Sequence, residues 1–190
     1  QCYNGYIVAE AEGYVRERYL YSTISSGEAN IILDNLYELN LDLKVDGGAT
    51  SDKAIISFTS ADVSDSIVWP EQKSIKLAEG EYNISVYVYE DGKINLPGID
   101  KEICNEVPRG GILGILGMTE EKCFEIKTPG QELENIVAGG GKTSDYLIES
   151  QLESGRIEIN VNSIPLPKNI EELQDSYNLI EVSPVYLEFG

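Results

Sequence analysis

The sequence predicts a mainly β protein, built as an antiparallel β-sandwich with a disulfide-closed loop and one short helix near the C-terminus. Three observations lead to this fold class. Apolar and polar residues alternate over many short segments, turn-forming residues separate those segments, and helical periodicity is confined to a few positions. We expect residues 1–98 to form the sandwich core. Residues 99–190 then form a second β-rich region, which either stands apart or completes the same domain.

Short segments with a period of two are predicted to be half-buried strands. The first alternates without a fault from residue 39 and ends at the turn-forming residues 46–48. The predicted strands are residues 39–45, 54–58, 66–69, 74–77, 81–89, 122–126, 156–161 and 185–189. Residues 8–21 fit either a strand or a helix, and we favour a strand.

Residues 81–96 carry the clearest local pattern, that of a β-hairpin. One face of its first strand is apolar and the other is polar, so a single pairing register is expected. This register buries Tyr82, Ile84, Val86 and Val88. In the same register, the side chains of Asn83, Ser85 and Tyr87 point outward or towards a second layer. The dipeptide Asp91-Gly92 indicates a type I′ turn, after which residues 93–96 form the returning strand.

Helical patterns are few. Residues 169–177 place Ile170, Leu173 and Tyr177 on one helical face, and Asn169 is suited to cap the N-terminus of that helix. Residues 131–138 fit a short turn of helix that ends at the three glycines 139–141.

The composition excludes several functions. The chain has 190 residues with 14 basic and 33 acidic side chains, a net charge of −19. Such acidity argues against binding to nucleic acids and anionic membranes, which both need a basic surface. The chain has no histidine, which excludes the usual hydrolase triads and histidine-ligated metal sites. No apolar run approaches the ~18 residues of a membrane-spanning helix.

The three cysteines indicate an oxidising compartment. Cys104 and Cys123 lie in polar, strand-like surroundings 19 residues apart, a spacing that suits a loop-closing disulfide. The alternative is two reduced thiols in a cytosolic protein. Cys2 is left over, and its state is open. The chain starts at Gln1 rather than Met, as a processed chain does, so we expect an extracellular or cell-surface protein. Asn83 begins a sequon and is a candidate glycosylation site.

A run within residues 74–89 adds a family resemblance. Its pattern consists of Leu77, Gly80, Tyr82, Val86 and Val88. This run resembles a strand pair of small surface β-sandwiches, the prealbumin-like and carboxypeptidase-regulatory-like modules of exported proteins. The resemblance implies an immunoglobulin-like or prealbumin-like sandwich that serves as a stalk, spacer or adhesion module and not as an enzyme.

Residues 138–144 partly match a phosphate-binding loop. Three glycines precede Lys142 and Thr143, but the full pattern needs a further glycine where the chain has Ile136. The preceding stretch is also too polar for the buried strand that normally feeds such a loop. We therefore expect a flexible glycine linker here and no nucleotide binding.

The segment between the two cysteines is apolar and rich in glycine. Its large side chains are Ile112, Leu113, Ile115 and Leu116. One interpretation is a loop folded back onto the sandwich, with glycines where backbones approach closely. The other is an exposed apolar tip that contacts a partner or a lipid surface. The C-terminal strand, residues 184–189, is a second candidate for contact, because after Pro184 it has neither lysine nor proline to protect an edge.

Two ligand hypotheses remain open beside a structural or adhesive role. An aromatic platform of Trp69, Tyr87 and Tyr89 could bind a glycan. Calcium could bind a pair of neighbouring carboxylates, since this ion takes 6–8 oxygen ligands. The pairs are Asp42 with Asp46, Asp62 with Asp65, and Glu90 with Asp91. Our interpretation is a secreted or surface protein that acts by assembly or adhesion, through protein partners or self-association. We expect no catalysis and no cofactor other than calcium, and the alternative is a glycan- or calcium-binding module.

Overall fold

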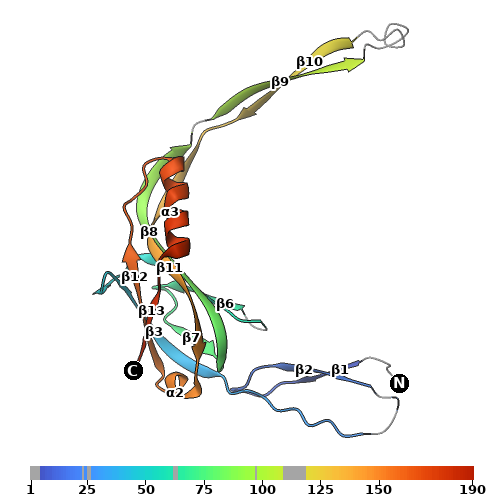
Figure 1. Cartoon of the computed structure of the whole chain (residues 1–190), viewed down its shortest axis with the longest axis vertical. Helices are drawn as coiled ribbons and strands as arrows, with labels where there is room; N and C mark the ends of the chain where they lie inside the picture. The colour runs from blue at the N-terminus through green and yellow to red at the C-terminus, as the bar shows by residue number, and fades with distance from the viewer. Residues whose placement is uncertain (1–4, 23, 25–26, 62–63, 97, 109–118) are drawn as a thin grey trace.

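The computed structural model describes residues 5–22, 24, 27–61, 64–96, 98–108 and 119–190, and it is mainly β (Figure 1). The elements are β1 (Gly5–Ala9), β2 (Glu17–Tyr21), β3 (Tyr37–Val45), β4 (Gly48–Ala49), β5 (Lys53–Thr59), β6 (Ser64–Trp69), β7 (Ser74–Leu77), β8 (Gly80–Leu96), β9 (Ile99–Pro108), β10 (Thr119–Thr128), β11 (Gln131–Leu147), α2 (Glu149–Leu152), β12 (Arg156–Ser163), α3 (Ile170–Val182) and β13 (Tyr186–Phe189). Each predicted strand segment overlaps one of these strands.

The body of the protein is one curled nine-stranded sheet. Its main path runs β4-β3-β12-β11-β8-β5-β6, while β13 pairs with β12 and β7 pairs with β3. All pairs are antiparallel except that of β12 with β3. Strands β12 and β11, which follow residue 98 in the sequence, thus lie between strands that precede it.

The core lies on the inner face of this curled sheet. Alternate residues of β3, β5, β8 and β12 point into a single apolar cluster, which also takes in side chains of β6 and β7. The burial predicted for the first half of β8 is confirmed: Tyr82, Ile84, Val86 and Val88 are each at most 3% exposed. The period-two pattern therefore identified the core face of this strand correctly.

The turn predicted at Asp91-Gly92 is wrong. Strand β8 continues through both residues to Leu96 and pairs with β11 on either side of an irregularity at residues 134–136. A type I′ turn needs positive φ at both central residues, and neither Asp91 nor Gly92 has one. That geometry occurs instead at Asp46 (φ 51°) and Gly47 (φ 79°), which connect β3 to β4.

The helix and linker predicted for residues 131–141 are also wrong, because both belong to β11. Its three glycines lie where several backbones meet. A Cβ atom on Gly140 would lie 2.1 Å from the carbonyl oxygen of Val86, and one on Gly141 would lie 2.7 Å from that of Pro184. Close backbone approach, not flexibility, explains the glycines. Pairing with β8 overrides the local helical pattern.

Helix α3 forms where the sequence predicted it. The Asn169 side chain caps it by accepting a hydrogen bond from the Glu172 backbone N–H. Its buried face packs on the outer side of β11 in a second, smaller cluster with Val137, Ile164 and Ile180. The helix does not end the chain, since β13 follows it, and the four-residue helix α2 was not predicted.

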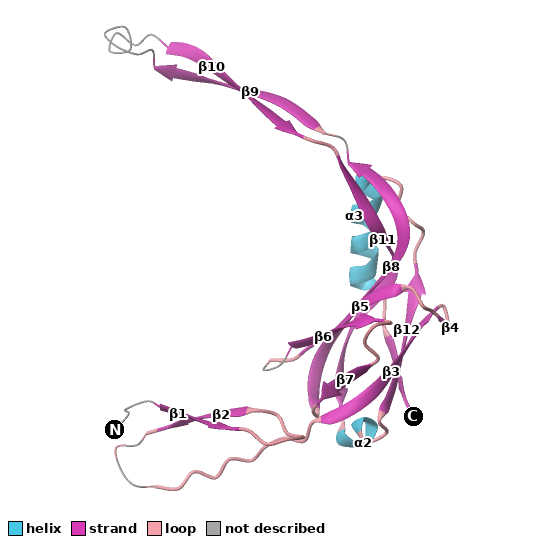
Figure 2. Ribbon diagram, turned by 180° about the vertical axis from the view of Figure 1, so that it is seen from behind, coloured by secondary structure: helices cyan, strands magenta, loops and turns pink. Residues whose placement is uncertain are grey.

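Two hairpins project from the body (Figure 2). The upper parts of β8 and β11 leave the body as a curved ribbon that α3 supports, and β9 and β10 extend it further. The hairpin of β1 and β2 leaves the opposite end of the body. The molecule is therefore an elongated arc with its main core in the body and a smaller cluster under α3.

We predict that Val86→Ala lowers the free energy of unfolding by about 1–3 kcal/mol, from lost burial plus a cavity term. Val86 is 0% exposed, whereas Val68, on the outer face of β6, is 44% exposed. Urea unfolding of both alanine variants is the measurement, with Val68→Ala as the matched control. Equal losses for the two variants would contradict the assigned core face.

Candidate functional site

The hairpin formed by β9 and β10, here called the disulfide arm, is the most distinctive projecting feature. Its strands pair in register from Ile99↔Thr128 to Pro108↔Thr119, and Cys104 lies directly opposite Cys123. The predicted Cys104–Cys123 disulfide is present and joins the two strands near their middle. Among the described elements, β9 and β10 have extensive contacts only with each other.

One face of the disulfide arm is acidic. Because side chains alternate along a strand, the residues two positions from each cysteine share its face. They are all glutamates, with Glu102 opposite Glu125 and Glu106 opposite Glu121, and all four are exposed. Like charges directly opposite each other destabilise strand pairing. The covalent bond between these two glutamate pairs therefore opposes their repulsion.

The other face of the disulfide arm carries an exposed apolar pair. Ile103 lies opposite Phe124, and the two side chains are 38% and 58% exposed. An isolated two-stranded hairpin is at best marginally stable in water, because it has no core. Here the disulfide takes the place of a core, and it leaves both faces available for contact.

Four predicted contact residues, Ile112, Leu113, Ile115 and Leu116, lie outside the described residues, and so does Cys2. These four residues lie in the sequence between β9 and β10. That segment joins Pro108 to Thr119, which are partners at the far end of the disulfide arm.

The hairpin of β1 and β2, here called the N-terminal hairpin, is the second projecting feature. It exposes large apolar side chains, among them Tyr6, Val8, Tyr19 and Leu20. The guanidinium of Arg18 lies 4.8 Å from the ring centre of Tyr6. Among the described elements its two strands also have extensive contacts only with each other.

A polar cluster holds α3 against the ribbon below the disulfide arm. Lys142 Nζ lies 2.6 Å from Glu181 Oε1, and the Tyr87 hydroxyl donates to the same oxygen at 3.4 Å. The hydrogen bond from Lys142 lowers the pKa of Glu181, and the same bond raises the pKa of Lys142. Nearby, burial raises the pKa of Tyr89 to about 12.

The structure does not bring the predicted aromatic platform together. Trp69 is 6% exposed in the core, where its indole N–H donates to the Thr50 carbonyl at 3.1 Å. Tyr87 and Tyr89 lie on the outer face of the sheet, packed against the cluster under α3. Asn83 is exposed on β8, where its Oδ1 accepts a hydrogen bond from Ser144 at 2.6 Å.

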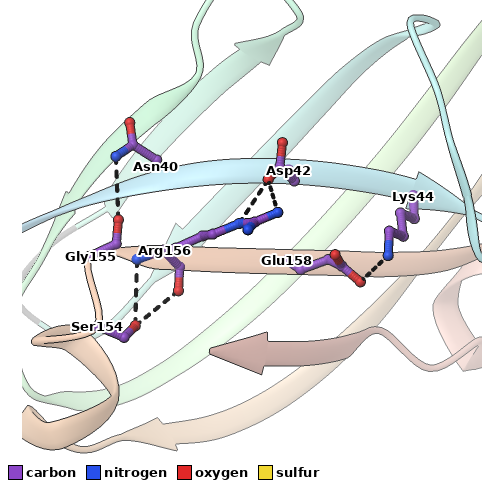
Figure 3. Close-up of polar contacts among 7 residues, drawn as sticks. All are labelled: Asn40, Asp42, Lys44, Ser154, Gly155, Arg156 and Glu158. Carbon is purple, nitrogen blue, oxygen red and sulfur yellow. Dashed lines mark hydrogen bonds and ion pairs between the residues drawn. The ribbon is translucent and has the colours of Figure 1, made fainter. Parts of the chain in front are cut away.

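The predicted calcium pair on β3 is occupied by other protein groups (Figure 3). Asp42 Oδ2 binds Arg156 at 2.8 and 3.0 Å, which joins β3 to β12. Asp46 accepts a hydrogen bond from the Ser163 backbone N–H, and hydrogen bonding by Ser163 lowers the pKa of Asp46. Asp62 lies outside the described residues.

Carboxylates elsewhere do not form a ligand set in the described part of the chain. A pocket of about 520 Å³ beside the N-terminal segment is lined by Glu17, Asp34, Glu79 and Glu81, among others. Their oxygens do not converge on one point. Within the described residues, the only grouping compact enough for a metal ion is Glu102 with the two cysteines, whose sulfur atoms are bonded to each other.

The edge strands of the curled sheet differ in whether side chains form hydrogen bonds with their outward-facing backbone groups. On β6, the Ser66 N–H donates to the side chain of Asp65 and the Val68 N–H donates to that of Gln72. These bonds cap the edge. On β13, the edge away from β12 makes no hydrogen bond to any described residue. Local alternation could not reveal this difference, which depends on where each strand lies in the sheet.

We predict that replacing both Cys104 and Cys123 by serine opens the disulfide arm without unfolding the body. The arm buries nothing against the core, so the body's free energy of unfolding should change by less than about 0.5 kcal/mol. Fluorescence of Trp69 during urea unfolding reports on the body, and amide hydrogen exchange reports on the arm. Retained protection in β9 and β10 of the variant would contradict the role given to the disulfide.

We predict that the contact of α3 with β11 weakens in acid. Because the pKa of Glu181 is lowered in the folded state, its contribution is present above the usual glutamate value of 4.5 and is lost as the pH falls through the folded value. Unfolding of wild type and Glu181→Gln should therefore differ at pH 6 and converge as the pH falls below the lowered pKa of the folded state. Asp175→Asn, in the same helix, is the control. A difference independent of pH would contradict the pairing.

Comparisons of the chain with protein-family models, curated proteins and solved structures find no match. The resemblance of residues 74–89 to prealbumin-like modules therefore stays a prediction. In the described part of the chain, no helix has the length and apolar character needed to cross a membrane.

Proposed function

We propose that this chain is an exported β-sandwich protein with a structural or adhesive role outside the cell, and that the disulfide arm is the element that contacts its partner. The proposal includes no catalytic step. Its main support is the arm itself: two paired strands that project from the body, closed by a disulfide and exposed on both faces.

The dimensions of the disulfide arm suit contact at a distance. Each strand has ten residues, which corresponds to about 34 Å at the usual rise of a strand. Ordering a hairpin of this length without a core costs conformational entropy, and the disulfide offsets part of that cost. An exposed disulfide persists in an oxidising compartment, which supports an extracellular location.

The segment that joins the two strands of the disulfide arm differs in composition from the rest of the chain. Residues 109–118, which join its strands, contain no acidic residue, although the whole chain has a net charge of −19. Together with Ile103 and Phe124, they supply apolar groups that a partner would cover. This combination favours a protein contact on the arm.

The sandwich architecture is also part of the proposal. Strands β3, β7 and β12 and strands β5, β6 and β8 contribute to one apolar cluster. A core shared in this way is what two facing layers of a sandwich produce. The glycan- and calcium-binding alternatives have less support. Most of their predicted residues are buried, engaged with other groups or outside the described part of the chain, and the exposed pair Glu90 with Asp91 is not in a grouping of three ligands compact enough for a metal ion.

The disulfide arm can be removed cleanly, which makes the proposal testable. Leu96 and Gln131 are partners at its base, so an Asn-Gly turn can replace residues 97–130. In the cells that produce the protein, we expect a membrane-impermeant biotin reagent to label wild type at the cell surface. The armless variant should fold, as judged by Trp69 fluorescence, but be released into the medium.

Point variants test whether the surface of the disulfide arm makes the contact, without removing the arm. Phe124→Asp on the disulfide arm should reduce surface retention, while Tyr146→Asp on the body, at a residue of similar exposure (58% and 55%), should not. The proposal fails if wild type is recovered from the cytoplasm with both cysteines reduced, or if the armless variant is retained as well as wild type.

A further inference from the structure

We propose that copies of this chain join head to tail by strand addition, with the N-terminal hairpin of one copy pairing to the open edge of β13 in the next. The inference deepens the structural role proposed above and rests on it, but it involves different elements from the disulfide arm.

The N-terminal hairpin has the properties of a donor. Its two strands of five residues pair with each other through one edge, and the outer edge of each pairs with no other described strand. Tyr6 and Leu20, which lie opposite each other, are 59% and 57% exposed. Strand addition would supply hydrogen bonds to the backbone and cover these side chains.

Charge favours the N-terminal hairpin over other surfaces for contact between copies. A chain with a net charge of −19 repels its own copies. Within the paired residues of β1 and β2, however, the only charges are those of Glu17 and Arg18, which cancel. These paired strands are neutral and apolar, so they can approach a second copy at little electrostatic cost.

Strand β13 has the properties of an acceptor, which the edge strands β6, β7 and β4 lack. The edge of β6 is capped by Asp65 and Gln72. Strand β7 carries an exposed lysine, Lys76, which is a common edge protection. β4 has two residues. By contrast, β13 pairs with β12 along one edge, and its sequence Tyr-Leu-Glu-Phe has no lysine or proline.

The side chains of β13 also suit this donor. Leu187 and Phe189 pack against the core, while Tyr186 is 54% exposed. Glu188 is exposed on the same face as Tyr186, so an added strand would place Arg18, the only cation of the paired strands β1 and β2, near a carboxylate. Charge complementarity therefore favours the N-terminal hairpin over a second β13 as the occupant.

The positions of donor and acceptor predict the kind of assembly. In Figure 1 the N-terminal hairpin and the C-terminal strand lie on opposite sides of the lower body. A contact between two different surfaces on opposite sides is heterologous, and it continues as an open chain unless its rotation closes a ring. Pairing of β13 with β13 would instead stop at a dimer and leave both hairpins uncovered.

Two variants and their mixture test the inference by sedimentation velocity. Tyr6→Lys with Leu20→Lys changes the donor, and Tyr186→Lys with Glu188→Lys changes the acceptor while the inward-facing residues stay. Neither pair touches the core. We expect wild type to show species whose mass grows with concentration, each variant alone to be monomeric, and an equimolar mixture to form dimers and nothing larger.

The controls and contrary outcomes are distinct. Val68→Lys, on the capped edge of β6, should polymerise as wild type does. A wild type that stays monomeric up to its solubility limit overturns the inference, and so does a mixture without dimers. Loss of association in only one of the two variants indicates self-pairing of β13 or of the hairpin, and it also overturns the inference. Surface retention through the disulfide arm is measured separately, so the proposed function and the head-to-tail assembly can fail independently of each other.

Discussion

The meeting of backbones at Gly139–Gly141 is the constraint on which the rest of the structure depends. At this point β11 contacts β8 on one side and β12 on the other, and the Lys142 N–H donates to the carbonyl of Ser183 at the end of α3. A side chain at Gly140 would collide with the backbone of β8. The glycines therefore allow the two halves of the curled sheet, the helix and the final strand to be joined at one place.

From that junction, the molecule separates a stable body from projecting parts that lack a core. The ribbon of β8 and β11 is supported by α3 through the Lys142–Glu181 pair and the tyrosines beneath the helix. Beyond the helix, burial can no longer hold the strands together, and a covalent bond does so in the disulfide arm. In the described residues, the N-terminal hairpin has neither a supporting helix nor a disulfide, and its paired strands expose apolar side chains and carry no net charge. Both projections thus lack a core, but only the disulfide arm has a covalent bond that replaces one.

The acidity of the chain gives these differences a functional meaning. A surface with a net charge of −19 stays soluble and keeps copies apart. In our proposals, contacts are confined to places where short-range forces act: the apolar pair of the disulfide arm, the N-terminal hairpin, and the edge of β13. Capping of β6 by Asp65 and Gln72 shows that the fold protects one edge and not the other. Selective exposure of this kind is what a protein of assembly or adhesion requires.

The sequence by itself determined the features that depend on near neighbours. Alternation placed the strands and the buried face of β8, and Asn169 marked the start of α3, because side-chain direction and capping are local properties. The pairing of Cys104 with Cys123 followed from spacing and strand-like surroundings. Tertiary structure alone decided that Asp91-Gly92 is not a turn, that residues 139–141 are a junction, and that Trp69 is buried apart from Tyr87. Each of these depends on pairing with strands tens of residues away, and the energy of that pairing exceeds the local preference.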